Sequence, residues 1–179
     1  MEFWFGAPDS SERGRPRGAW FRKSAAFDAR IRDRFLALWE RGARGELDPW
    51  RSTPLAALAL LVVLDQFPRN MFRGEARAFS TDPRALAAAQ DAVARGFDRP
   101  LLPHERTFIY LPFEHAEDLA AQRRSLELFR SGDPDNVEWA KRHYDVVARF
   151  GRFPHRNAAL GRTSTPEEVE FLGQPGSSF

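Results

Sequence analysis

Two polar turns carry residues that could recognise a charged ligand. They read "FPRNMFRG" over residues 67–74 and "FPHRNAALGR" over residues 153–162, and both contain Phe-Pro, Arg-Asn and a later glycine. The second turn has one additional residue, His155, which lies between Arg152 and Arg156. Two guanidinium groups beside a histidine whose charged form they disfavour would suit a carboxylate or a phosphate. The alternative interpretation is an exposed basic turn without a ligand.

Histidines near carboxylates form a second group of candidates. The segment "PFEHAED" places His115 beside Glu114 and Asp118, a combination that suits general acid–base chemistry or a hard metal ion bound by all three. The alternative is a helix start enriched in acids, which the helix dipole favours, with a half-exposed histidine. His143 shares a helical face with Phe150 and is expected to be buried, either as a hydrogen-bonded core residue or as a ligand.

Asp65 follows the most apolar stretch of the chain, residues 55–64. A carboxylate in the last turn of a helix meets the negative end of the dipole and needs compensation. Arg69, four residues later, is the expected partner. Asp65 is therefore either half of a structural ion pair or a carboxylate at the mouth of a pocket. Asn70 and Asn157 could cap the helices that follow them, or contact a ligand.

These residues make up one predicted site. The candidate catalytic residues are His115, His155 and Asp65. The candidate ligand-binding residues are Arg69, Asn70, Asp118, His143, Arg152, Arg156 and Asn157. The chain has no cysteine and no HExxH, di-iron, Walker, Rossmann or nucleophile-elbow motif. No metal and no cofactor is therefore expected.

Helical periodicity and capping residues predict the elements that must position this site. No strand-like alternation is present, so the chain is predicted to be all-α, with short connections that favour antiparallel helical hairpins. The expected helices are a Ser24-capped helix to Arg41, Leu55 to Gln66 stopped by Pro68, Pro83 to Arg95, a short segment His104 to Leu111 between Pro103 and Pro112, a helix from Glu114 to Gly132, an Asn136-capped helix to Gly151, and a helix opened by a Thr165–Glu168 capping box.

Composition limits the classes of protein and partner. The 179 residues suit a single domain, with 42% hydrophobic and 29% charged residues. The net charge is +2, and there is no basic run, so no nucleic-acid partner is expected. The longest apolar run has ten residues, against roughly 18 for a membrane span, and the N-terminus lacks a signal-peptide pattern. We expect a soluble, cytoplasmic protein; its oligomeric state stays open.

The two polar turns also indicate an internal repeat. Each follows a helix and precedes a loop that opens a new helix at a Ser-Thr and proline pattern, residues 80–83 and 164–166. A pseudo-repeat centred on 55–95 and 137–172 would explain this arrangement. Generic helix punctuation would explain it equally well.

Several motifs resemble one known family over nearly the whole chain. They are "FWFG", "LDQFPRNMFRG…AFSTDP", "ARGFDR", "LPFEHAEDLAAQ", "RFGRFPHRNAALGR.STPEE" and "PGSSF". Together they are similar to the bacterial domain-of-unknown-function family 924. The resemblance implies a tetratricopeptide-like, right-handed helical array and supplies no activity to carry over to this chain. The helix Leu55 to Gln66, apolar on every side, is expected to be its buried central helix. Where the family carries serine, this chain has Ala116, which argues against a need for a hydroxyl there.

Two functions remain open at this stage. One is a polar Arg/His/Asn/Asp pocket that binds a small anionic molecule and could use acid–base chemistry. The other is a tetratricopeptide-like adaptor that binds a protein partner and whose polar turns are purely structural. Because the unusual residues lie in turns rather than along helix faces, the pocket is favoured. Whether the protein is an enzyme is left open.

Overall fold

The computed structural model describes residues 1–7, 9–11 and 13–177, and this part of the chain is helical without any strand. The all-α prediction is confirmed. The α-helices are α1 (Glu2–Phe5), α2 (Ala25–Ala43), α3 (Pro54–Leu61), α4 (Phe67–Met71), α5 (Asp82–Ala94), α6 (Pro103–Glu114), α7 (Leu119–Gly132), α8 (Val137–Phe150) and α9 (Pro166–Leu172). The short helical segments are η1 (Asp48–Ser52), η2 (Val62–Gln66), η3 (Ala76–Phe79), η4 (Pro134–Asn136) and η5 (Pro154–Arg156).

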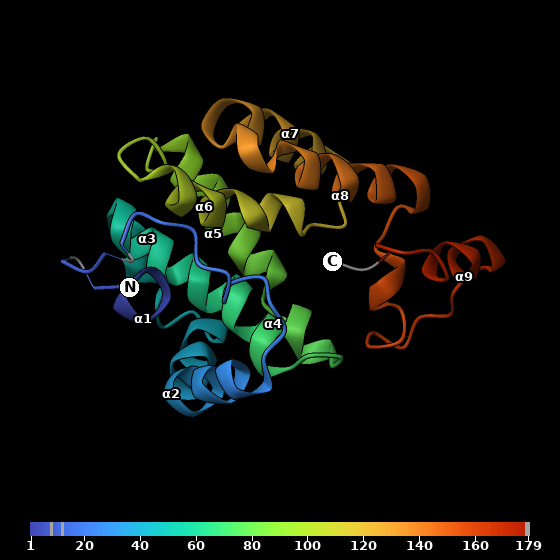
Figure 1. Cartoon of the computed structure of the whole chain (residues 1–179), viewed down its shortest axis with the longest axis horizontal. Coiled ribbons are helices and arrows are strands. Elements are labelled where there is room, and N and C mark those ends of the chain that lie inside the picture. Colours follow the sequence, from blue (N-terminus) through green and yellow to red (C-terminus); the bar gives the residue numbers. More distant parts are fainter. Residues whose placement is uncertain (8, 12, 178–179) are drawn as a thin grey trace.

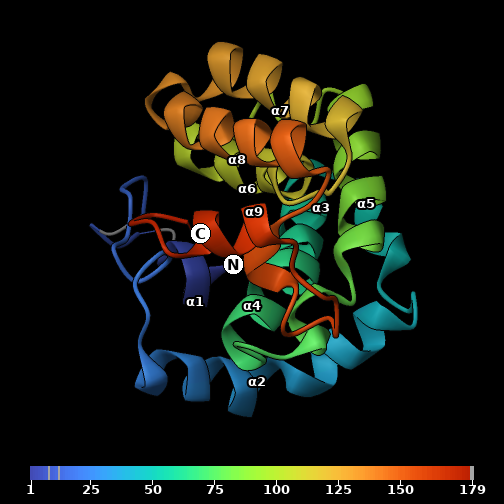
Figure 2. The same cartoon turned by 90° about the vertical axis from the view of Figure 1, so that its right-hand side faces the viewer.

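The helices form layers around α3, η2 and α4, which run as one rod through the centre of the molecule (Figure 1). Helix α2 packs against this rod on one side, and α5 and α6 pack against it on the other. The hairpin of α7 and α8 covers α6. Figure 2 shows the C-terminal segment with α9 between the α7–α8 layer and the layer of α2 and α4. Leu58, Leu60 and Leu61 of the rod are fully buried.

The central rod does not stop at Pro68, contrary to the prediction from sequence. The segment η2 is a π-helical turn, and the Phe67 N–H donates to the Val62 carbonyl five residues back. Pro68 has no N–H to donate to the Leu64 carbonyl. The Thr81 hydroxyl donates to that carbonyl instead, at 2.5 Å. The rod therefore continues as α4, and Asp65 lies inside it rather than at its end.

Helix α6 also continues past a proline that was expected to end it. Pro112 lies within α6, which reaches Glu114. A helical proline costs about 3 kcal/mol, and burial of the flanking Leu111 and Phe113 in the core outweighs this cost. His115 consequently ends α6 as its C-cap residue, whereas the sequence suggested that it began a helix.

Most other helix boundaries lie within about two residues of the predicted ones, but α7 begins at Leu119 and not at Glu114, because Asp118 caps it. Side-chain caps form at Ser24, Thr53 and Thr165, the last as a capping box with Glu168. Asn136 does not cap α8; its amide donates to Asp133 Oδ2 at 2.8 Å. A tetratricopeptide-like order of helix pairs and the internal pseudo-repeat both stay predictions. No described helix is long and apolar enough to cross a membrane.

A buried polar cluster at the helix junction

The two Arg-Asn turns meet inside the molecule, although their backbones differ. The first turn is helical and forms α4, whereas the second follows the left-handed Gly151 (φ 71°) and forms η5. Arg69 of the first turn binds Asp82 through two hydrogen bonds, of 2.8 and 3.0 Å. Arg156 of the second turn donates to the same carboxylate at 3.1 Å. Asp82 therefore joins the two turns.

The polar cluster is a closed circuit of contacts around this junction. From Asp82 the circuit passes through Arg69 to Asp65, then to His115, and returns through His143, Phe153 and Arg156. Rings of His115 and His143 lie 6.1 Å apart between centroids, and those of His143 and Phe153 lie 5.6 Å apart. The members of the polar cluster are Asp65, Arg69, Asp82, Glu114, His115, His143, Phe153 and Arg156.

Asp65 is the most heavily partnered carboxylate of the cluster. It is 1% exposed, lies 3.2 Å from Arg69 Nη1 and accepts a hydrogen bond of 2.6 Å from Gln66. Its two oxygens lie 2.8 and 3.0 Å from Nδ1 of His115. Burial alone would raise the pKa of Asp65, but the Arg69 charge and His115 outweigh burial and hold this pKa well below its ordinary value.

The Asp65 carboxylate fixes the tautomer of His115. A carboxylate can only accept, so Nδ1 of His115 carries the proton and donates it. Burial and the neighbouring Arg69 lower the pKa of His115, which favours the neutral ring. The lone pair then resides on Nε2. His115 thus offers a base or a ligand atom whose orientation is held by a buried acid.

Arg156 is short of compensating charge. Its side chain is 6% exposed and its guanidinium lies over the rings of Phe79 and Phe153, at 4.6 and 4.5 Å. Its Nε atom is buried and has no hydrogen-bond partner among the described residues. Burial and the nearby Arg69 lower the pKa of Arg156 to about 10. By contrast Asp65 and Asp82 outweigh burial at Arg69 and raise the pKa of that residue.

Glu114 and His143 are two buried members of the cluster that contact each other. Glu114 Oε1 lies 3.2 Å from His143 Nδ1, which also lies 2.9 Å from the Trp139 carbonyl. Burial, followed by the charges of Asp65 and Asp133, raises the pKa of Glu114 to about 8. Burial places the pKa of His143 well below its ordinary value.

The remaining predicted residues are divided between this cluster and structural contacts. His155 packs near the cluster, with its ring 5.6 Å from that of Phe153, and burial together with Arg156 lowers its pKa to about 4. Four others bind elsewhere. Arg152 forms a bidentate pair with Glu168, Asn157 donates to Ser164 and Glu168, Asn70 donates to the Gln66 carbonyl, and Asp118 caps α7 by accepting from Ala121.

Two acids, Asp82 and Glu117, bind the arginines of the two turns, and neither was predicted from the sequence as a site residue. Asp82 precedes a proline at a helix start, so it is indistinguishable from an ordinary capping residue. Glu117 binds Arg162 at 2.5 and 2.8 Å and accepts the Phe153 N–H at 2.7 Å. The signal that could have found Glu117 is the arginine at the end of "FPHRNAALGR", which needs a counter-charge.

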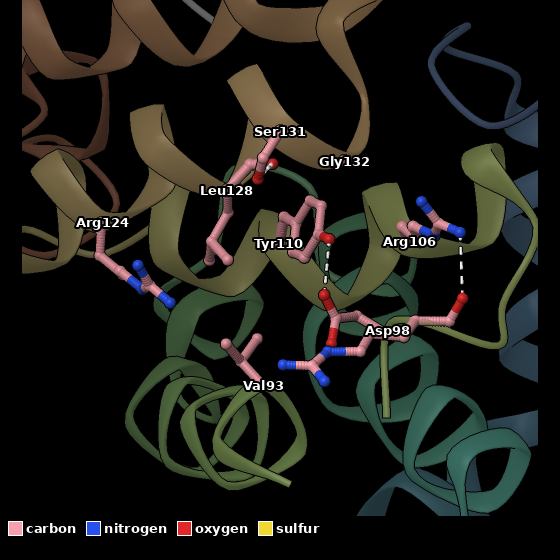
Figure 3. A pocket seen from close by; sticks show the side chains of 9 residues that line it. Val93, Asp98, Arg106, Tyr110, Arg124, Leu128, Ser131 and Gly132 are labelled. Atoms are coloured by element: carbon pink, nitrogen blue, oxygen red, sulfur yellow. Dashed lines mark hydrogen bonds between the residues drawn. The ribbon is translucent and has the colours of Figure 1, made fainter. Parts of the chain in front are cut away.

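A separate surface pocket of about 360 Å³ lies between α5, α6 and α7 (Figure 3). No member of the polar cluster lines it. Its polar groups largely bind one another: the Tyr110 hydroxyl donates to Asp98 at 2.8 Å, and Arg106 donates to the Arg99 carbonyl at 3.0 Å. A second pocket, of about 330 Å³, includes Asp118. Because the polar cluster retains unsatisfied buried atoms, we consider it the stronger site candidate.

The fold and the cluster define an all-α protein whose helix ends meet at a buried network of ion pairs and histidines. Residues 1–176 match the family described as "Bacterial protein of unknown function (DUF924)", and the chain belongs to this family. The resemblance drawn from its motifs is thereby confirmed. A solved protein of unknown function from Agrobacterium tumefaciens is similar, with 45% identity, a TM-score of 0.86, and coverage of 96% of this chain and 93% of that chain. No curated protein matches.

Proposed function

We propose that this protein binds a small anionic molecule at the polar cluster and carries out acid–base chemistry on it. The observation that carries the proposal is Arg156, a buried guanidinium that shares its carboxylate partner with Arg69. Burying a charge is unfavourable unless it is paired and hydrogen-bonded. A carboxylate or phosphate that accepts from Nε of Arg156 would satisfy both requirements.

The acid–base part of the proposal starts at His115. Its Nδ1 proton is held by Asp65 at 2.8 Å, so the Nε2 lone pair faces away from that acid. The side chain of His115 is 13% exposed, and those of Arg69 and Asp82 are 17% and 16% exposed. These three residues define the side from which a small molecule would approach. His155 and His143 supply further neutral imidazoles nearby.

The bidentate ion pairs favour one alternative function. Arg152 with Glu168 and Arg162 with Glu117 are complete without a ligand. They support a helical adaptor in which the polar turns only hold the C-terminal segment in place. Trp139, half exposed on α8, would then belong to a protein-binding face.

A thermal-shift screen of carboxylates and phosphates separates these functions. The screen uses protein dialysed against a chelator, so that metal ions do not contribute. We expect at least one anion to raise Tm of the wild type and of Arg149→Gln, whose arginine pairs with Glu167 on the surface. Arg156→Gln should lose this ligand-dependent shift, because the substitution removes the charge but keeps much of the side-chain volume.

Two outcomes would contradict the proposal. One is the absence of any anion-dependent shift in the wild type. The other is a shift that persists in Arg156→Gln, which would place the anion elsewhere, for example among the arginines of the pocket in Figure 3. Far-UV circular dichroism of Arg156→Gln shows whether the variant is folded. Arg156→Lys restores the charge and should recover part of the shift.

A further inference from the structure

Three side chains of the polar cluster converge as metal ligands do. Glu114, His115 and His143 each offer a ligand-type atom, and these atoms lie within 4.8 Å of one another. The first two residues end α6, and the third comes from the facing helix α8. Two histidines and one carboxylate with further positions open is a donor set used by zinc hydrolases and by non-haem iron proteins. Motif searches miss it because the ligands are not spaced along one helix.

Both histidines are anchored in the manner of metal-bound histidines. In such sites the ring nitrogen that does not bind the metal donates to a carboxylate or a backbone carbonyl. Nδ1 of His115 contacts Asp65 at 2.8 Å, and Nδ1 of His143 contacts the Trp139 carbonyl at 2.9 Å. Since both acceptors lack a proton, each histidine carries its proton on Nδ1 and has its lone pair on Nε2.

Glu114 gives an independent reason to expect a cation. Its side chain is only 4% exposed, and Oε2 is buried with no hydrogen-bond partner among the described residues. Its Oε1 lies 3.2 Å from His143 Nδ1, which already donates to a backbone carbonyl. No arginine or lysine forms an ion pair with Glu114 in the described part of the chain. A buried carboxyl oxygen without a hydrogen-bond partner, as Oε2 is here, is rare and calls for an explanation.

We propose that Glu114, His115 and His143 bind a divalent transition-metal ion, with Asp65 as the residue that positions His115. The donor set suits Zn²⁺ or Fe²⁺ rather than Ca²⁺ or Mg²⁺, which prefer oxygen ligands. Bonds of about 2.0–2.1 Å to nitrogen require the three side chains to draw together slightly. This inference goes beyond the proposed function, and it shares with it only the His115 tautomer set by Asp65. While a metal ion is bound, Nε2 of His115 is a ligand and does not accept a proton.

Titration of chelator-treated protein with Co²⁺ and with Zn²⁺ tests the site without any anionic ligand. We expect one Co²⁺ per chain, with visible absorption bands that Zn²⁺ abolishes. Glu114→Gln and His143→Asn should each weaken binding strongly, and Asp65→Asn should weaken it roughly 10- to 100-fold. His104→Asn is the matched control, because its imidazole stacks on Trp20 outside the cluster. It should bind as the wild type does.

Several results would overturn the metal site. They are no stoichiometric binding by the wild type, unchanged affinity in Glu114→Gln and His143→Asn, or equal weakening in His104→Asn. Should the variants fail to fold, the wild type still decides the question. Zn²⁺ should then shift the imidazole NMR signals of His115 and His143 and leave those of His104 unchanged, and the opposite pattern refutes the site. Because the anion screen contains no metal, each proposal can fail without the other.

Discussion

At the scale of single residues, the polar cluster is organised by which charges share a partner. Asp82 forms ion pairs with two arginines, whereas Asp65 contacts three partners: Arg69, His115 and Gln66. The surplus of positive charge therefore lies at Arg156, and the acid that keeps an unpartnered buried oxygen is Glu114. Arg156 Nε and Glu114 Oε2 are the atoms of these two residues that are buried without a hydrogen-bond partner among the described residues.

Asp82→Asn tests whether this shared carboxylate holds the two turns together. We expect a loss of about 3 kcal/mol in the free energy of unfolding, because the buried Arg156 would lose its ion-pair partner and would still face the charged Arg69. Asp48→Asn is the control: Asp48 also precedes a proline at a helix start but is 48% exposed, so its loss should stay below about 1 kcal/mol. Urea unfolding measures both. Equal losses would show that Asp82 acts only as a helix-start residue.

Single residues also show what sequence could reveal about the site. The Asp65–Arg69 contact was predicted because Arg69 follows Asp65 by four residues and carries the opposite charge, and it is confirmed at 3.2 Å. The pairing of Asp65 with His115 and of Arg156 with Asp82 joins residues far apart in the chain. Side-chain types carry no information about such partners, so only the fold could supply them.

At the scale of elements, two prolines, Pro68 and Pro112, were wrongly predicted to end helices, for the same physical reason. Proline removes one N–H, but a helix continues when that loss is compensated by other groups or by packing. Compensation comes from the π turn and Thr81 at Pro68, and from core burial at Pro112. Capping residues, in contrast, are local signals, and the helix starts that they predicted at Ser24 and Thr165 are confirmed.

Thr81→Val measures the compensation at Pro68. The substitution keeps the shape of the side chain but removes the hydroxyl that donates to Leu64 O and accepts from Trp39 at 3.3 Å. Two buried polar atoms lose a partner, so we expect a destabilisation of about 2 kcal/mol. Thr163→Val, at an exposed position, is the control and should change stability little. If Thr81→Val left the free energy of unfolding unchanged, the Leu64 carbonyl would need no donor in place of the missing Pro68 N–H.

The C-terminal elements should respond to acid through Glu168. The hydrogen bonds from Arg152, together with the Thr165 N–H, lower the pKa of Glu168 from 4.5 to about 2. A depressed pKa contributes stability above pH 4.5, and this contribution disappears as the pH falls towards 2. Arg152 is 28% exposed, so we expect a loss of only about 1 kcal/mol. Unfolding curves of Glu168→Gln should lack this decrease, and an identical acid dependence in the variant would contradict the assignment.

At the scale of the whole molecule, the fold brings the central rod and the ends of several other helices to one point. The central rod supplies Asp65 and Arg69, α5 supplies Asp82, the end of α6 supplies Glu114 and His115, and α8 with η5 supplies the rest. The C-terminal segment lies between the two helical layers beside this point (Figure 2). Aromatic side chains such as Trp4 and Phe108 fill much of the core elsewhere.

The claim that separates this account most clearly from a purely structural network is that the junction binds a metal ion. Diffraction from Co²⁺-soaked crystals, measured at wavelengths on both sides of the cobalt absorption edge, tests it most directly. The account predicts one anomalous peak within bonding distance of Glu114, His115 and His143, with Asp65 still bound to Nδ1 of His115. A junction without a peak, with cobalt only on surface histidines or carboxylates, would contradict it.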